Sequence, residues 1–157
     1  MSFQLSKKEI IEINLKKKCY LDNRAVSIEA LKIVQKNRKW ICIEAIVAIA
    51  NLLGISKEEV EGVATFYSHI FRKPVGRNII KYCDSVVCFI NGYVEIEEKL
   101  ISLLNINIGE TTEDKRFTLL PTCCLGACDK GPVLLINEDI HHNITQDGIS
   151  CLLEKYK

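Results

Sequence analysis

The sequence has 157 residues, of which 48% are hydrophobic and 26% are charged, and its formal net charge is +1. This balance is typical of a folded protein and argues against intrinsic disorder. The length allows one ordinary core, or a small helical unit joined to a second domain. Because no run of roughly 18 apolar residues occurs and the first residues lack the apolar segment of a signal peptide, we expect a cytoplasmic protein without direct membrane insertion.

Charge is distributed unequally along the chain. Residues 1–74 contain 13 Lys and Arg against 8 Asp and Glu, whereas residues 75–157 contain 8 against 12. The simpler interpretation is that the two halves have solvent-exposed surfaces of opposite net charge. The alternative is that the basic half docks onto an acidic partner. No stretch resembles a nucleic-acid-binding pattern, so we expect no nucleic-acid partner.

Two capping boxes mark helix starts in the first half of the sequence. Ser6 with Glu9 predicts a helix that extends to about Lys17, and Ser56 with Glu59 predicts a later one. In each box the serine hydroxyl can accept a hydrogen bond from the backbone amide three residues later, and the glutamate carboxylate can accept one from the backbone amide of the serine. These two boxes therefore predict at least two helices in the first half of the chain.

Between these boxes the apolar residues recur at helical spacing. They predict a second helix over residues 22–39 and a third over 43–53. The third is nearly all apolar, so we expect it to be buried on most sides, and Gly54 after it is suited to a left-handed helix end.

The helical pattern stops at Pro74-Val-Gly76. We place a domain boundary there, between an N-terminal all-α helical bundle domain, residues 1–74, and a second domain, residues 75–157.

The second half has the pattern of an α/β domain. Residues 78–83 and 116–120 read as strands, and a helix that we expect Asn91 to cap lies between them. Strand, helix and strand over this length predict two parallel strands joined by a right-handed crossover. Further strands are expected at 133–136 and 140–143, before a final helix capped by Thr145.

Two cysteine pairs follow the two predicted parallel strands. Cys83 and Cys88 come after the first strand, and Cys124 and Cys128 come after the second. Because parallel strands end at the same edge of a sheet, the four thiols should converge there. We expect the start of the Asn91 helix to lie near them, with its free N–H groups facing an anionic site, and Gly126 to let the second loop fold tightly.

Four converging thiolates are the ligands of an iron-sulfur cluster or of zinc. The pattern Cys-x-x-Cys is absent, which argues against thioredoxin-type dithiol exchange, and the spacings are less typical of zinc ribbons. Of the adjacent Cys123 and Cys124, the second closes the more compact loop, so we expect Cys123 to pack as a small buried residue. Cys19, Cys42 and Cys151 are likewise expected to fill the core.

The cysteine motifs resemble a known family. Cys83-x4-Cys88 and Cys124-Leu-Gly-Ala-Cys128, together with Val63-Ala-Thr-Phe-Tyr67 and the segment 111–119, are similar to the 24-kDa, or E, subunits of bacterial NADH-quinone oxidoreductase, respiratory complex I. The resemblance extends over essentially the whole chain.

The resemblance implies a thioredoxin-like domain that holds one [2Fe-2S] cluster behind an N-terminal helical domain. By motif matching, the cluster ligands are Cys83, Cys88, Cys124 and Cys128. It implies a non-catalytic electron-carrier subunit of an oxidoreductase, peripheral on the cytoplasmic side of the inner membrane, among other peripheral-arm subunits. FMN and NADH are expected on a larger partner subunit, and this sequence has no G-x-G-x-x-G or phosphate loop of its own.

Two alternatives remain at this point. Similar chains serve as diaphorase subunits of NAD-linked hydrogenases or formate dehydrogenases. A zinc-stapled interaction module without a redox role would use the same four thiols.

Overall fold

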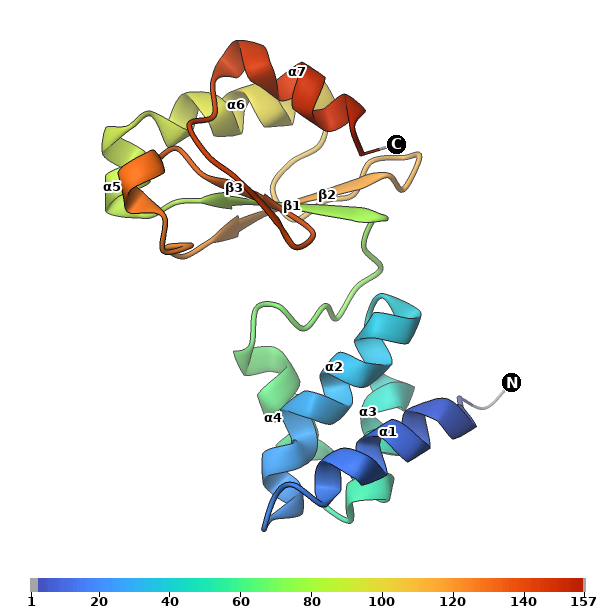
Figure 1. The fold of residues 1–157 in the computed structure, drawn as a ribbon. Coiled ribbons are helices and arrows are strands. Elements are labelled where there is room, and N and C mark those ends of the chain that lie inside the picture. The colour runs from blue at the N-terminus through green and yellow to red at the C-terminus, as the bar shows by residue number, and fades with distance from the viewer. Residues whose placement is uncertain (1–2, 157) are drawn as a thin grey trace. The chain divides into compact units, whose positions relative to one another are not determined.

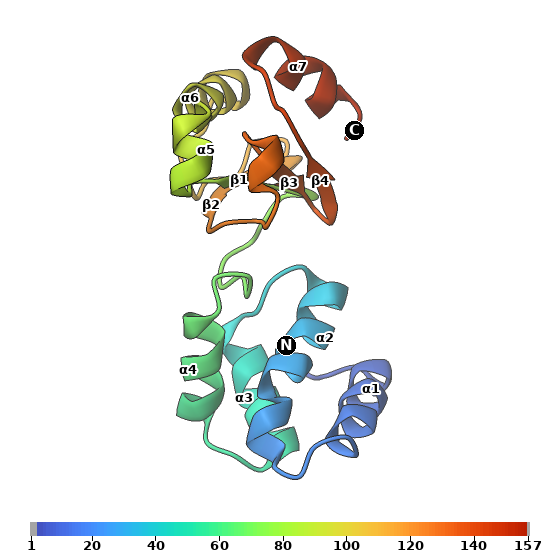
Figure 2. The ribbon, with the colours of Figure 1, turned by 60° about the vertical axis from the view of Figure 1, so that its left-hand side comes forward.

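The computed structural model describes residues 3–156. The chain is divided into two compact units, Met1–Pro74 and Val75–Lys157. The first contains helices, and the second combines helices with a sheet (Figures 1 and 2). No helix in the described part of the chain is both long and apolar enough to cross a membrane.

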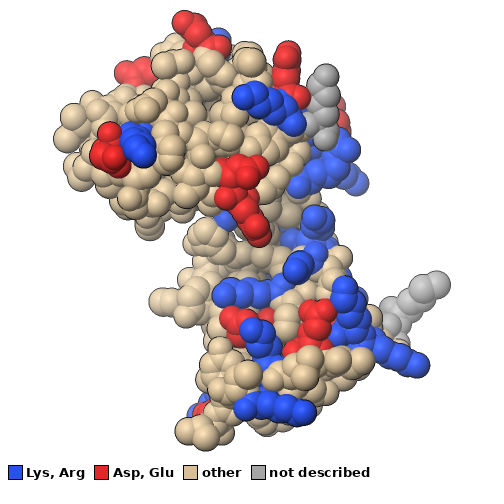
Figure 3. Space-filling model, viewed as in Figure 1, with Lys and Arg blue, Asp and Glu red and all other residues tan. Residues whose placement is uncertain are grey.

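Positive charge is prominent on the first unit. On the face drawn in Figure 3, Lys and Arg side chains predominate over Asp and Glu in this unit. The unequal charge seen in the sequence is thus present at its surface.

The helices of the first unit begin where the sequence places them, with one difference. The described elements are α1 Lys7–Lys17, the 3-10 helix η1 Asn23–Val26, α2 Ser27–Arg38, α3 Ile43–Leu53 and α4 Lys57–Phe66. Both capping boxes form: the Glu9 amide donates to Ser6 Oγ over 3.2 Å and the Ser6 amide donates to Glu9 Oε2 over 2.7 Å, with the same pattern at Ser56. The helix predicted over 22–39 is two elements, because the Asp22 carboxylate accepts from the Arg24 amide and starts a separate 3-10 turn.

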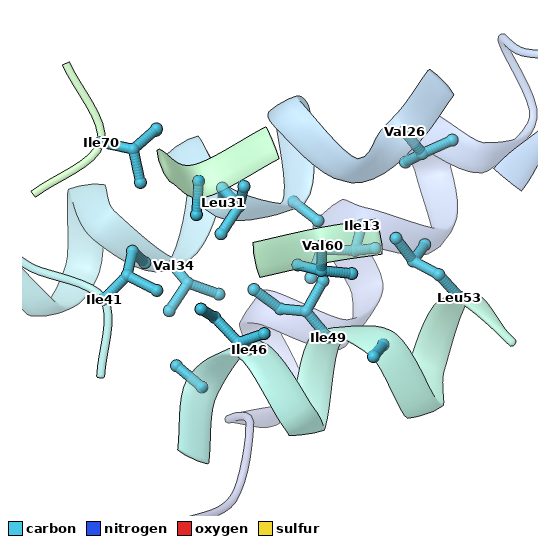
Figure 4. Packing of buried hydrophobic residues seen from close by; sticks show 14 residues of the cluster. Ile13, Val26, Leu31, Val34, Ile41, Ile46, Ile49, Leu53, Val60 and Ile70 are labelled. Atoms are coloured by element: carbon cyan, nitrogen blue, oxygen red, sulfur yellow. The ribbon is translucent and has the colours of Figure 1, made fainter. Parts of the chain in front are cut away.

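Apolar side chains from α1, α2, α3 and α4 meet in one cluster (Figure 4). Ile13, Leu31, Ile49 and Val60 are fully buried in it. The prediction that α3 is buried on most sides is wrong, because Ile43 is 65% exposed and other positions of that face also reach the surface. Gly54 ends α3 in the left-handed conformation (φ 69°), as expected.

The second unit is built on a mixed sheet. Its strands are β1 Asn78–Cys83, β2 Phe117–Thr122, β3 Leu134–Ile136 and β4 Asp139–His141, in the spatial order β2-β1-β3-β4. β1 pairs in parallel with β2, whereas β3 is antiparallel to both β1 and β4. The predicted parallel pair is therefore confirmed, whereas β3 runs in the opposite direction and β4 reverses the direction again.

Helices α6 Tyr93–Leu104 and α7 Gln146–Glu154 pack against the sheet. Both lie on the same face of it (Figures 1 and 2). Ile80 of β1 and Leu100 of α6 are fully buried in the core between these layers. Thr145 caps α7 as predicted, with its hydroxyl accepting from the Gly148 amide.

A short helix that was not predicted from the sequence follows β1. Residues Val86–Ile90 form α5, and Asn91 ends this helix instead of capping the next one. Gly92, with φ 84°, then turns the chain into α6, which begins without a side-chain cap. The prediction that Asn91 caps the crossover helix is therefore wrong, because one turn of helix comes before it.

Candidate metal centre

The register of the parallel strands places both cysteine pairs at one edge of the sheet. Cys83 is the last residue of β1 and pairs with Thr122, the last residue of β2. Cys88 lies on α5 directly beyond β1, and Cys124 lies two residues beyond β2. The loops that carry the four thiols therefore leave the sheet side by side.

The first pair is buried and surrounded by hydrogen-bond donors. Cys83 and Cys88 are 2% and 1% exposed. Burial alone would raise the pKa of Cys83, but hydrogen bonds from the backbone and hydroxyl of Ser85, the Cys88 thiol and the Leu125 amide outweigh it and lower that pKa. Burial, followed by the hydrogen bond to Cys83, raises the pKa of Cys88 to about 11, against the opposing hydrogen bond from the Val133 backbone. Three loops thus direct donors at these two sulfurs.

The second pair faces the surface. Cys124 is exposed and Cys128 is half-buried, and their Sγ atoms are 3.2 Å apart. The hydrogen bond with Cys124 raises the pKa of Cys128, and the electrostatic interaction with Cys83 raises it further. The two cysteine pairs are therefore close enough to interact electrostatically. Gly126 has φ 80° and its amide donates to Cys124 Sγ over 3.4 Å. The tight loop expected from this glycine is therefore present.

The chain between β2 and β3 closes the site on another side. A Cβ atom added at Gly131 would lie 3.4 Å from Cys88 Sγ and 3.0 Å from Asn91 Nδ2, so the backbone approaches the buried thiol closely. Neither this segment nor Ser85 was predicted from the sequence to take part in the site. The Gly131-Pro132 pair directly before a strand and the Asp84-Ser85 pair directly before an apolar run were the available signals.

Three of the four remaining cysteines are placed differently from the predictions. Cys123 and Cys151 are exposed, and so is Cys19, so the expectation that they fill the core is wrong. Cys42 is half-buried and packs against the core of the helical unit. Cys151 lies on the side of α7 away from the sheet, because Ile149, Leu152 and Leu153 form the buried side of that helix.

An apolar surface borders the site. On α5, Val86 is 71% exposed, Phe89 59% and Ile90 77%, whereas Cys88 on the same helix is buried. Large apolar side chains in one exposed group are a common feature of protein interaction surfaces.

The donors fit a binuclear iron-sulfur cluster. The four thiols are held as two pairs, and within residues 3–156 no three His, Cys, Asp or Glu side chains are arranged so that they could hold a metal ion. A [2Fe-2S] cluster takes four Cys thiolates, and amide hydrogen bonds to the sulfurs favour its anionic state. Amides of Ser85, Leu125, Gly126 and Val133 supply such hydrogen bonds here.

Comparisons with known proteins agree with this chemistry. The family model described as thioredoxin-like [2Fe-2S] ferredoxin matches residues 12–157. The chain is 61% identical to the E subunit of NADH-quinone oxidoreductase from Buchnera aphidicola subsp. Acyrthosiphon pisum (strain APS) over 157 residues, which are 100% of this chain and 97% of that protein. It is 60% identical to the E subunit from Escherichia coli (strain K12) over 156 residues, 99% of this chain and 94% of that protein.

A solved structure shows the same fold in another assembly. The NAD+-reducing [NiFe]-hydrogenase in its H2-reduced state matches 80% of this chain with a TM-score of 0.69 and 27% identity. The match spans only 22% of that hydrogenase chain. The near-complete matches, together with the cysteine site, show that the chain belongs to the family of E subunits of NADH-quinone oxidoreductase, within the thioredoxin-like [2Fe-2S] ferredoxins.

Proposed function

We propose that this chain is the electron-transfer subunit of an NADH-quinone oxidoreductase and that Cys83, Cys88, Cys124 and Cys128 hold its [2Fe-2S] cluster. The observation that carries the proposal is the grouping of the two cysteine pairs at the carboxyl ends of β1 and β2, with backbone donors from three loops directed at their sulfurs. When bound, such a cluster accepts and returns single electrons.

The protein residues divide their tasks between the two sides of the site. Cys83 and Cys88 anchor the buried side, where Ser85 donates hydrogen bonds that stabilise a thiolate away from water. Cys124 and Cys128 close the outer side, near the surface. A site that is buried on one side and close to the surface on the other keeps water from the sulfurs of Cys83 and Cys88 and leaves a short path to a partner.

The partner that fits this arrangement is the flavin-bearing subunit that oxidises NADH, with other peripheral-arm subunits around it. Hydride chemistry belongs to the flavin, and this chain exchanges electrons with it one at a time. The exposed apolar side chains of α5 lie beside the cysteine site and offer a docking surface for that subunit. Through the assembled complex the chain is peripheral on the cytoplasmic side of the inner membrane.

The two compact units correspond, in this proposal, to two domains. Residues 75–157 form the thioredoxin-like cluster-binding domain, because all four proposed ligands fall in the second unit. Residues 1–74 form the all-α helical bundle domain, which has its own hydrophobic cluster and contributes no ligand.

A diaphorase role in an NAD-linked hydrogenase is the second candidate, because the hydrogenase structure shares the fold. The sequence identity of about 60% to NADH-quinone oxidoreductase subunits over nearly complete chains favours the first candidate over a match of 27%. Purification of the native complex separates the two: quinone reductase subunits are expected, and co-purification with hydrogenase or formate dehydrogenase subunits would support the alternative.

The ligand assignment is tested by serine substitution of the adjacent cysteines. Cys124→Ser removes a thiol that lies 3.2 Å from Cys128, so we expect loss or strong distortion of the cluster. Cys123→Ser, the matched control, removes an exposed thiol and should keep the visible spectrum and the iron content of the unmodified chain. Equal cluster loss in both variants would refute the assignment.

A further inference from the structure

We propose that Cys124 and Cys128 form a reversible intramolecular disulfide in the cluster-free chain. We further infer that this bond determines when the site accepts a cluster, and this second part rests on the ligand set proposed above.

The geometry of the outer loop favours this bond. The two Sγ atoms are 3.2 Å apart, and a disulfide requires about 2.05 Å, so a small movement of one side chain is sufficient. Only three residues separate the cysteines, and Gly126 between them already has the left-handed conformation that folds the loop back on itself.

Accessibility separates this pair from the other. Thiol-disulfide exchange requires direct approach to a sulfur atom, which Cys124 allows because it is exposed. Cys83 and Cys88 are close to each other but are 2% and 1% exposed, so a dissolved oxidant reaches them only when the structure opens.

The other exposed cysteines do not offer a second pair. Cys19 and Cys151 are exposed, but in the described part of the chain neither lies within hydrogen-bonding distance of another sulfur. They can accept a small thiol as a mixed disulfide, but among residues 3–156 no neighbouring thiol is placed to release it. Cys123 is adjacent to Cys124 in sequence, and a bond between sequence neighbours would strain the peptide that joins them.

The reaction needs a small-molecule disulfide, such as oxidised glutathione, as the oxidant. The Cys124 thiolate attacks one sulfur of that disulfide, and the other leaves as a thiolate, which gives a mixed disulfide on Cys124. The Cys128 thiolate then attacks the Cys124 sulfur and expels the second small thiol. The protein loses two electrons and two protons, and the small disulfide gains both as two thiols.

The bond would have two effects on the cluster-free chain. It protects the exposed thiols from oxidation beyond the sulfenic stage, which is difficult to reverse. It also withholds two of the four proposed ligands, so that cluster loading has to follow a two-electron reduction of this loop.

The disulfide is tested by peptide mapping of the full-length, cluster-free chain after treatment with oxidised glutathione and alkylation of the remaining thiols. Cys19→Ser and Cys151→Ser provide a background without the isolated exposed thiols. We expect a cross-link between Cys124 and Cys128, alkylation of Cys83 and Cys88 after unfolding, and the same cross-link in Cys123→Ser. A dominant cross-link at Cys123 or between Cys83 and Cys88, or mixed disulfides alone, would overturn the proposal.

Loading kinetics test the second part. Iron and sulfide are added to the oxidised and to the reduced chain without a thiol reductant, and visible absorbance is followed. We expect the oxidised chain to load slower by about tenfold or more, and the difference to vanish after reduction. Equal rates with the disulfide present would overturn control of loading, whereas failure of the reduced chain to take up iron would instead contradict the proposed function.

Discussion

Glu9 is a buried carboxylate that joins the first two helices of the chain. Its side chain is 1% exposed, and its two oxygens accept from Nε and Nη2 of Arg38 over 2.9 and 2.8 Å. Arg38 also donates to the Gln4 carbonyl, and its guanidinium lies 4.1 Å from the centre of the Phe3 ring. The hydrogen bond from Arg38 lowers the pKa of Glu9, although burial opposes it.

We predict that Glu9→Gln destabilises the helical unit at neutral pH by about 2 kcal/mol, because it replaces a charged two-point contact with a neutral amide. Because the pKa of Glu9 is lower in the folded than in the unfolded chain, the ion pair contributes its full stability at pH values above the pKa of the unfolded chain, about 4.3. This contribution is lost as the pH falls through the pKa of Glu9 in the folded chain. The difference between Glu9→Gln and the unmodified chain should therefore shrink below about pH 4.

Urea unfolding followed by Trp40 fluorescence measures this difference, because the chain has one tryptophan and it lies in the helical unit. Glu12→Gln is the matched control: Glu12 is on the same helix, but its side chain is 39% exposed and 4.0 Å from Lys8, so little change is expected. A difference for Glu9→Gln that stays constant down to acid pH would contradict the ion-pair explanation.

Residue burial was only partly predictable from the sequence. The four cysteines at the strand ends could be placed because strand direction alone determines where they lie. The error at Cys151 was avoidable, since the α7 residues Ile149, Leu152 and Leu153 define its inner face and Cys151 lies on the other side. Cys19 lies beyond the end of α1, where helical spacing no longer indicates which side is buried.

Among the elements, α5 has the largest bearing on function. It is five residues long, too short for hydrophobic periodicity to reveal it. Its inner side carries Cys88, while Phe89 and Ile90 face outward beside the proposed cluster site. The helix thus holds one thiol in the interior and presents apolar side chains to the outside.

We predict that the double variant Phe89→Ser, Ile90→Ser binds the cluster normally but weakens affinity for the flavin-bearing subunit by about tenfold or more, since buried apolar anchors contribute most of the energy of such interfaces. Titration of the purified partner with the loaded chain measures the affinity, and the visible spectrum reports on the cluster.

Leu103→Ser provides the control, because Leu103 is an apolar residue of α6 with 42% exposure and lies on another element. If the α5 double variant binds the partner as tightly as the control does, α5 is not the docking surface.

Elements with local signals were predicted well, and elements defined by tertiary packing were not. The capping boxes at Ser6 and Ser56 and the end of α3 at Gly54 depend on neighbouring residues, so the sequence was sufficient for them. The amide donor at Val133 comes from a segment brought to Cys88 by the return of β3 beside β1, which no local pattern specifies.

For the molecule as a whole, the crossover topology explains how a chain without a local four-cysteine motif brings together the thiols of the proposed metal centre. Parallel pairing of β1 with β2 brings together two cysteine pairs that are separated by 35 residues of sequence. The antiparallel β3 then adds a third loop that closes over the buried thiols. The site is therefore a product of the fold, and the helical unit contributes to it no side chain that we propose as a ligand.

Electron paramagnetic resonance of the purified, dithionite-reduced full-length chain tests the central claim most directly, with iron, zinc and sulfide quantified on the same sample. A [2Fe-2S] cluster on the four cysteines predicts a rhombic signal of one unpaired electron per chain, with two irons and two sulfides. A chain rich in zinc that gives no signal after reduction would contradict the electron-transfer function and indicate a structural metal site.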